Sequence, residues 1–211
     1  MMKKNYYYDL SLAEITNLAT NPTKPKILLH VCCAPCSCFP LLFLAPHFDI
    51  TIYYNNSNIY PQNEYVKRKN ELKRYLEILK ENDSIVIPII EPEYDESFQN
   101  NLAILSNEPE GGKRCQLCYR LRMDEAYQYA HENNFDYFCT IMTISRQKDS
   151  IILNQIGEEL APKYPNTKYF HSDFKKKDGI TQGNAICKKN NLYCQRYCGC
   201  KYSLTNVKDQ N

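Results

Sequence analysis

Cysteines are the residues of this chain whose type and spacing point most directly to chemistry. Eleven occur among 211 residues, and seven of them fall into three groups. The groups are Cys32-Cys33-Ala-Pro-Cys36, Cys115-Gln-Leu-Cys118 and Cys198-Gly-Cys200. Thiolates bind zinc and iron, and neighbouring thiols can form disulfides, so metal binding and redox chemistry are the two interpretations. A single buried cysteine is often only a small apolar residue, but packing alone does not predict such crowding.

The first group follows an apolar run, Ile27 to Val31, which predicts a short buried strand. A second apolar run, Phe39 to Ala45, predicts a helix that starts near Ser37, a residue suited to the N-cap. The cysteines therefore occupy a strand-to-helix turn, where open parallel sheets usually bind ligands. Backbone N–H groups and the helix dipole at such a turn favour the thiolate, which is the form that binds metal.

The second group places two thiolates on one turn of a predicted helix, a spacing that suits one metal ion or a cluster. A thioredoxin-like redox pair is the alternative, but that motif would follow the first strand, where Cys32 and Cys33 stand. Together, Cys32, Cys33, Cys115 and Cys118 provide four thiolates, enough for zinc or a 4Fe–4S cluster. Neighbouring cysteines can bind one centre here because the strand has ended before them.

The third group would close a very small disulfide ring, which should be strained and easily reduced. Cys198 and Cys200 therefore suit a redox shuttle, while a pair of metal ligands and an inert tail are the alternatives. The cysteines at positions 38, 139, 187 and 194 stand alone, and we expect them to pack or to lie exposed. His30 belongs to the end of the predicted strand, where a structural role is expected.

Alternating apolar and helical patterns predict the frame that positions these groups. Five strands are expected, over residues 27–31, 49–54, 84–90, 135–143 and 168–173. Helices are expected over residues 5–24, 37–45, 61–82, 115–133, 148–163 and 181–191, with a partly helical stretch over 91–107. Pro88 places the third strand at an edge or shortens it. This alternation predicts an α/β fold, a single domain with a mostly parallel sheet flanked by helices.

The composition is that of an ordinary globular protein, with 43% hydrophobic and 24% charged residues. No secretory signal is visible in the first 25 residues, and no apolar run approaches the ~18 residues of a membrane span. We therefore expect a cytoplasmic protein without a membrane partner, where structural disulfides are disfavoured. The chain also lacks a Walker loop and the Ser-Gly-Gly-x-Asp-Ser loop of ATP pyrophosphatases, which argues against adenylation chemistry.

Basic residues are unevenly distributed, although the net charge is only +2. They gather over residues 67–74, 113–122 and 163–201. Such stretches are often only solvated faces. Interleaved with tyrosines, they also fit an acidic partner such as RNA. The candidate RNA contacts are Arg120, Arg122, Lys175, Lys176 and Lys177.

Taken together, these motifs resemble the QueH family of epoxyqueuosine reductases. The main matches are Leu29-His-Val-Cys-Cys-Ala-Pro-Cys36, Asn58-Ile-Tyr-Pro61, Glu64-Tyr65 and Glu108-Pro-Glu-Gly-Gly-Lys-Arg-Cys-Gln-Leu-Cys-Tyr-Arg-Leu-Arg122. Further matches, which extend the likeness over residues 27–203, are Phe135-Asp-Tyr137, Ile156-Gly-Glu-Glu159, Asp173-Phe174 and Tyr197-Cys-Gly-Cys200. The resemblance implies a fold similar to the adenine-nucleotide α-hydrolase (HUP) type. It also implies a 4Fe–4S cluster and the last step of queuosine synthesis in tRNA, the two-electron removal of the epoxide oxygen.

The resemblance assigns roles to the cysteines. It implies cluster ligands at Cys32, Cys33, Cys115 and Cys118, a redox-active pair at Cys198 and Cys200, and a candidate ligand of an additional adjacent iron at Cys36. The family usually has Ser or Thr where Cys38 and Cys139 stand, so these two should be dispensable. Some members have Ser-Pro in place of Ser145-Arg146. The expected division is an N-terminal extension over 1–25, an iron–sulfur catalytic domain over 26–203 and a tail over 204–211.

The reaction requires an acid on the epoxide oxygen and two electrons, and a cluster passes one electron at a time. A nearby dithiol or a second iron could supply or store the other electron. The candidate acids are Tyr54, Tyr60, Glu64 and Asp149. The expected partners are tRNA carrying epoxyqueuosine and an electron donor. Two other classes of protein would use the same cysteines: a zinc-bound RNA-binding module and a metal-free thiol oxidoreductase acting on proteins.

Overall fold

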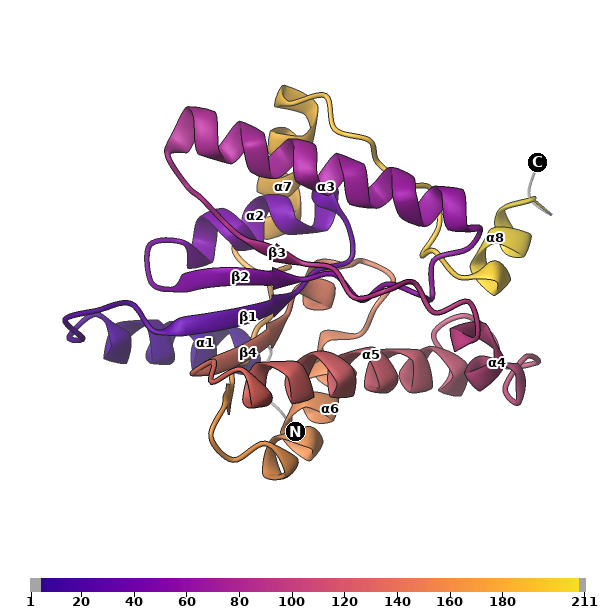
Figure 1. Ribbon diagram of the computed structural model, residues 1–211, viewed down its shortest axis with the longest axis horizontal. Coiled ribbons are helices and arrows are strands. Elements are labelled where there is room, and N and C mark those ends of the chain that lie inside the picture. The colour runs from indigo at the N-terminus through magenta and orange to yellow at the C-terminus, as the bar shows by residue number, and fades with distance from the viewer. Residues whose placement is uncertain (1–4, 209–211) are drawn as a thin grey trace.

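The computed structural model describes residues 5–208 of the chain (Figure 1). Its centre is a five-stranded sheet in the order β3-β2-β1-β4-β5, and every neighbouring pair of strands is parallel. The strands are β1 (Lys26–His30), β2 (Asp49–Tyr53), β3 (Ile89–Ile90), β4 (Tyr137–Thr140) and β5 (Lys168–Tyr169). This strand order is typical of doubly wound α/β sheets, so the predicted fold class is confirmed.

Helices cover both faces of this sheet (Figure 1). They are α1 (Tyr6–Leu18), α2 (Ala34–Leu44), α3 (Gln62–Asp83), α4 (Phe98–Ala103), α5 (Lys113–Glu132), α6 (Ser150–Leu160), α7 (Gly179–Lys189) and α8 (Lys201–Lys208). Two short 3-10 helices, η1 (Ile141–Ile144) and η2 (Ala161–Lys163), follow β4 and α6. Helices α2, α3 and α7 pack together on one face, while α5 and α6 pack together on the other.

The central strand β1 shows why the sheet must be covered on both sides. Ile27, Leu28 and Leu29 are all fully buried. Because side chains alternate along a strand, Ile27 and Leu29 join the core under α2 and α3, while Leu28 joins the core under α5 and α6. A continuous apolar run of this kind fits a central strand of a parallel sheet.

Several boundaries differ from the sequence predictions, among them the start of one helix and the extent of two strands. Helix α2 begins at Ala34 rather than near Ser37, because Cys33 is extended and serves as its N-cap residue while Pro35 sits in the first turn, where proline is favoured. The predicted strand over 84–90 is reduced to Ile89–Ile90 at the sheet edge, as Pro88 indicated. The strand expected over 168–173 pairs only at Lys168–Tyr169.

Parts of the predicted extension and tail, residues 1–4 and 209–211, lie outside the described residues. Helix α8 was not predicted; it is only eight residues long. Within residues 5–208, none of the helices combines the length and the apolar character that crossing a bilayer would need.

Candidate metal and redox site

The first cysteine group lies at the carboxyl edge of the sheet, between the end of β1 and the start of α2. The Sγ atoms of Cys32, Cys33 and Cys36 all lie within 4.8 Å of one another, and those of Cys32 and Cys33 are 3.8 Å apart. Hydrogen bonds from Cys33 and Cys36 hold the pKa of the Cys32 thiol well below its usual range. Hydrogen bonds with Cys32 and Cys33 raise the pKa of the Cys36 thiol. Of the three thiols, Cys32 is therefore the one whose surroundings favour the thiolate.

The second group lies at the start of α5, close to the third. Cys115, Cys118, Cys198 and Cys200 line one cavity of about 20 Å³, which is too small for anything but a water molecule or an ion. Burial raises the pKa of Cys115, and it raises that of Cys118 to about 11. The two thiols are therefore neutral until a metal or another cation displaces their protons.

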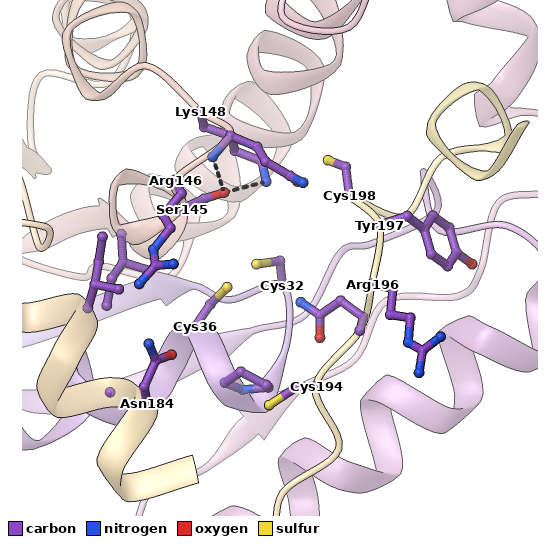
Figure 2. A pocket seen from close by; sticks show the side chains of 16 residues that line it. Cys32, Cys36, Ser145, Arg146, Lys148, Asn184, Cys194, Arg196, Tyr197 and Cys198 are labelled. Atoms are coloured by element: carbon purple, nitrogen blue, oxygen red, sulfur yellow. Dashed lines mark hydrogen bonds between the residues drawn. The ribbon is translucent and has the colours of Figure 1, made fainter. Parts of the chain in front are cut away.

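A larger pocket of about 280 Å³, here called the thiol pocket, opens beside the first group (Figure 2). Cys32, Cys36 and Cys198 line it together with Lys148 and Gln195. Cys198 also lines the small cavity, so it stands between the first and second cysteine groups. Figure 2 shows the Cys32 and Cys36 sulfurs on one side of the pocket, with Cys198 and Lys148 across from them.

Two buried cations, Arg122 and Lys148, accompany the thiols. They are only 2% and 7% exposed. Burial lowers the pKa of both side chains, but nearby cysteine sulfurs raise it. Cys118, Cys32 and Cys198 act on Arg122, and Cys198 and Cys32 act on Lys148, so that the pKa of each cation is raised overall. Among the residues that the structure describes, neither makes a salt bridge with a carboxylate.

The neutral partners of these cations are few. Arg122 donates to Asn56 Oδ1 at 3.0 Å and to Met142 Sδ at 2.7 Å, while its Nε has no partner. Within residues 5–208, the one hydrogen bond of Lys148 Nζ goes to Ser145 Oγ, at 3.5 Å. Buried charges are normally paired, and the acidic groups that act on both cations include cysteine thiols.

Gln195 connects the thiol pocket to the first group. Its Nε2 donates to Cys33 Sγ at 2.9 Å, while its Oε1 is buried without a partner. Neither Gln195 nor Lys148 was singled out from the sequence. The sequence could have indicated Lys148 as a site residue, because it follows β4 at the same sheet edge as the first cysteine group. Gln195 lies in an irregular segment, where a glutamine gives no comparable signal.

The candidate acids lie away from the thiol pocket. Tyr54 is fully buried and its hydroxyl donates to the Tyr65 carbonyl. Glu64 accepts from Arg68, and the Asp149 carboxylate caps α6. Tyr60 is 45% exposed, and none of the four lines the thiol pocket.

The candidate RNA contacts are scattered. Arg122 is interior, as described above, and Arg120 forms an ion pair with Glu159. Lys175 donates to the Lys148 carbonyl at 2.7 Å, and Lys176 lies 3.8 Å from Asp173. Lys177 is exposed and adopts a positive φ of 50°. Lys176 and Lys177 are therefore the lysines of this run that remain most available to a nucleic acid.

Cys38 and Cys187 do not stand alone. Their Sγ atoms lie 3.5 Å apart in the core between α2 and α7. Cys139 is fully buried in β4, where its thiol lies 3.7 Å from Ser172 Oγ. Cys194 is exposed and lines the thiol pocket.

The fold and the site define a doubly wound α/β protein that gathers thiols and buried cations at the carboxyl edge of its sheet, an arrangement typical of metal-dependent redox proteins. A family model described as epoxyqueuosine reductase QueH matches residues 27–206. The chain therefore belongs to the QueH family of epoxyqueuosine reductases, which are oxidoreductases.

Individual relatives agree with this assignment. Epoxyqueuosine reductase QueH of Streptococcus pyogenes is 39% identical over 181 residues, covering 85% of this chain and 71% of the relative. The QueH protein of Staphylococcus epidermidis is 35% identical over 207 residues, covering 96% of this chain and 87% of the relative. Among solved structures, the U34-tRNA thiolase NcsA from Methanococcus maripaludis with its 4Fe–4S cluster superposes with a TM-score of 0.49 at 11% identity, covering 98% of this chain and 74% of that one.

Proposed function

We propose that this chain reduces epoxyqueuosine in tRNA to queuosine, using a 4Fe–4S cluster held by Cys32, Cys33, Cys115 and Cys118. The observation that carries the proposal is the pair of buried cations, Arg122 and Lys148, which face thiols of several cysteine groups and have no carboxylate partner among the described residues. A cluster with four thiolate ligands is an anion, so it would supply the counter-charge that these side chains lack.

The donor set fits such a cluster. Thiolates are the usual ligands of iron–sulfur clusters, and Cys32 and Cys33 present theirs from one turn while Cys115 and Cys118 present theirs from the start of one helix. Gln195 would donate an N–H···S hydrogen bond to the Cys33 ligand. Cys36 lies against the same sulfurs but outside this set, which makes it the candidate ligand for an additional adjacent iron.

The reaction removes oxygen from an epoxide, forming a carbon–carbon double bond and water from two electrons and two protons. When bound, the cluster supplies single-electron transfer. The chain holds the substrate ring in the thiol pocket, where the Lys148 ammonium can donate a hydrogen bond to the leaving oxygen. The buried Gln195 Oε1 can accept from a ring hydroxyl, which would satisfy its missing hydrogen bond.

Cys198 and Cys200 would supply the two electrons and two protons that the reaction consumes. Oxidation of two thiols to one disulfide releases two electrons and two protons, which is what the epoxide consumes. An external electron donor, such as a one-electron carrier protein or a low-potential chemical reductant, must then reduce the disulfide. Because Cys198 lines both the thiol pocket and the small cavity, it stands where electrons could pass between substrate and cluster.

The decisive test is anaerobic reconstitution with iron and sulfide, followed by incubation with tRNA carrying epoxyqueuosine and a reductant. We expect a brown protein whose product, after digestion of the tRNA, contains queuosine by mass spectrometry. A colourless zinc protein that binds tRNA without conversion would identify the RNA-binding module instead. Disulfide exchange on protein substrates by metal-free protein would identify the thiol oxidoreductase.

Binding of the tRNA should depend steeply on salt, because lysine contacts to phosphates release counterions. Reversing the exposed charges in a Lys176→Glu/Lys177→Glu variant should weaken binding and reduce the slope of log K against log salt. Lys175 is left intact, since it hydrogen-bonds the Lys148 carbonyl. Lys188→Glu/Lys189→Glu, on the last turn of α7, is the matched control for net charge. Equal salt slopes for wild type and the first variant would exclude Lys176 and Lys177 from the tRNA contact.

A further inference from the structure

Helix α3 holds the segment that carries the third cysteine group. We call this segment, residues 190–200, the strap; it joins α7 to α8 and passes α3 on the way (Figure 1). Four residues on one face of α3 form hydrogen bonds with it, at spacings of four, three and three: Glu64, Arg68, Glu71 and Arg74. Such spacings place side chains along one side of a helix.

The contacts run in order along the strap. Arg74 donates to the carbonyls of Asn190 and Asn191, and Glu71 accepts from the backbone N–H of Tyr193 at 2.6 Å. Glu64 accepts from the Tyr193 hydroxyl at 3.1 Å. Arg68 then donates to the carbonyls of Tyr197 at 3.3 Å and Cys198 at 3.1 Å.

Arg68 differs from the other three because it is buried, at 2% exposure, directly beside the Cys-Gly-Cys loop. Its guanidinium binds Glu64 at 2.7 Å through Nε and uses both remaining nitrogens for the loop carbonyls. Gly199 has a φ of +133°, and a Cβ built there would lie 3.1 Å from Arg68 Nη1. The Gly199 carbonyl accepts from the Tyr60 N–H at 2.7 Å, so the loop is fixed on both sides of Cys198.

We propose that Arg68 is a positioning residue for the redox pair: by holding the carbonyls of Tyr197 and Cys198, it fixes the Cys198 thiol between the thiol pocket and the small cavity. This inference rests on the proposed redox role of Cys198 and Cys200. A guanidinium suits the task because its planar fork serves three acceptors at once, whereas an ammonium is a single point charge. Charge alone therefore cannot replace it.

The test compares Arg68→Lys with Arg74→Lys in anaerobically reconstituted full-length protein. Arg74 is the matched control, because it lies on the same helix, pairs with the glutamate three residues before it and donates to two successive strap carbonyls outside the Cys-Gly-Cys loop. A Glu64→Gln/Arg68→Leu double variant removes the buried Arg68 charge together with the charge of its Glu64 partner, and it covers the case in which one unpaired charge prevents folding. Three quantities are measured: iron content, the alkylation rate of Cys198 by peptide mass spectrometry, and multiple-turnover rate.

We expect Arg68→Lys and the double variant to keep wild-type iron content. Their Cys198 should be alkylated faster than that of wild type. Their turnover rate should fall on the order of 10²-fold, which is the cost of misplacing a reacting group by about 1 Å. Arg74→Lys should match wild type in all three. Wild-type alkylation and turnover in both Arg68 variants would overturn the inference, as would equal losses in Arg74→Lys. A Cys198→Ser variant that turns over like wild type would instead remove the redox role itself, so the two failures are distinguishable.

Discussion

Replacing Cys115 or Cys118 by serine should yield a colourless protein with almost no iron or sulfide, where wild type should carry about four of each per chain. Both thiols lie at the start of α5, and Cys118 is 7% exposed, so no other group can take its place without rebuilding the helix. A hydroxyl is a poor ligand for iron because it does not ionise as a thiol does. Iron and sulfide analysis with an anaerobic absorption spectrum measures the effect, and activity should vanish with the colour.

Cys139→Ser is the matched control for the loss of a buried thiol. Cys139 is fully buried in β4, and a serine hydroxyl there could donate to the nearby Ser172 hydroxyl or the Thr140 carbonyl. This variant should keep its cluster and its activity. Full iron and sulfide content in Cys115→Ser would remove that residue from the ligand set and, with it, the proposed grouping of four.

Replacing Cys198 or Cys200 by serine should have the opposite pattern: a brown protein that binds tRNA but fails over repeated turnovers. The two thiols supply the electron pair in the proposed reaction, and Cys198 is the one thiol of the described residues that lines both cavities. Queuosine formation is followed by mass spectrometry of digested tRNA under multiple-turnover conditions. A single turnover driven by a strong chemical reductant should survive, because the reductant bypasses the pair.

Cys194→Ser is the control for this second experiment. Cys194 is an exposed thiol that also lines the thiol pocket, but it lies outside the small cavity. Its replacement should leave repeated turnover within about twofold of wild type. Loss of iron in the Cys198 or Cys200 variants would make these residues metal ligands, and a wild-type rate would deny them a redox role.

The central strands could be predicted because burial and pairing coincide there. Ile27 to Leu29 lie between two neighbouring strands of the sheet and beneath helices on both faces, so their apolar run indicates both strand pairing and burial. At the sheet edges, burial and strand pairing no longer coincide. Ile87, for example, is buried at 9% exposure yet precedes the pairing at Ile89, so its apolar side chain predicted a strand that the backbone does not form.

The cysteine spacing predicted which thiols share a turn, but not how the groups meet. Cys198 is brought to the first two groups by contacts between α3 and the strap, which join residues about 130 positions apart. Local patterns carry no information on such pairs. The burial of Lys148 could not be predicted either, because a lysine in a loop is normally solvated and becomes interior only when the site supplies a compensating charge.

The buried cations have a consequence for the life of the protein in a cell. A chain that has lost its cluster would keep Arg122 and Lys148 inside with fewer negative charges to balance them, and binding free energy of a metal centre is also folding free energy. We therefore expect the iron-free form to open more often and to be degraded first by proteases. The abundance of the enzyme, and not only its activity, would then follow the supply of iron.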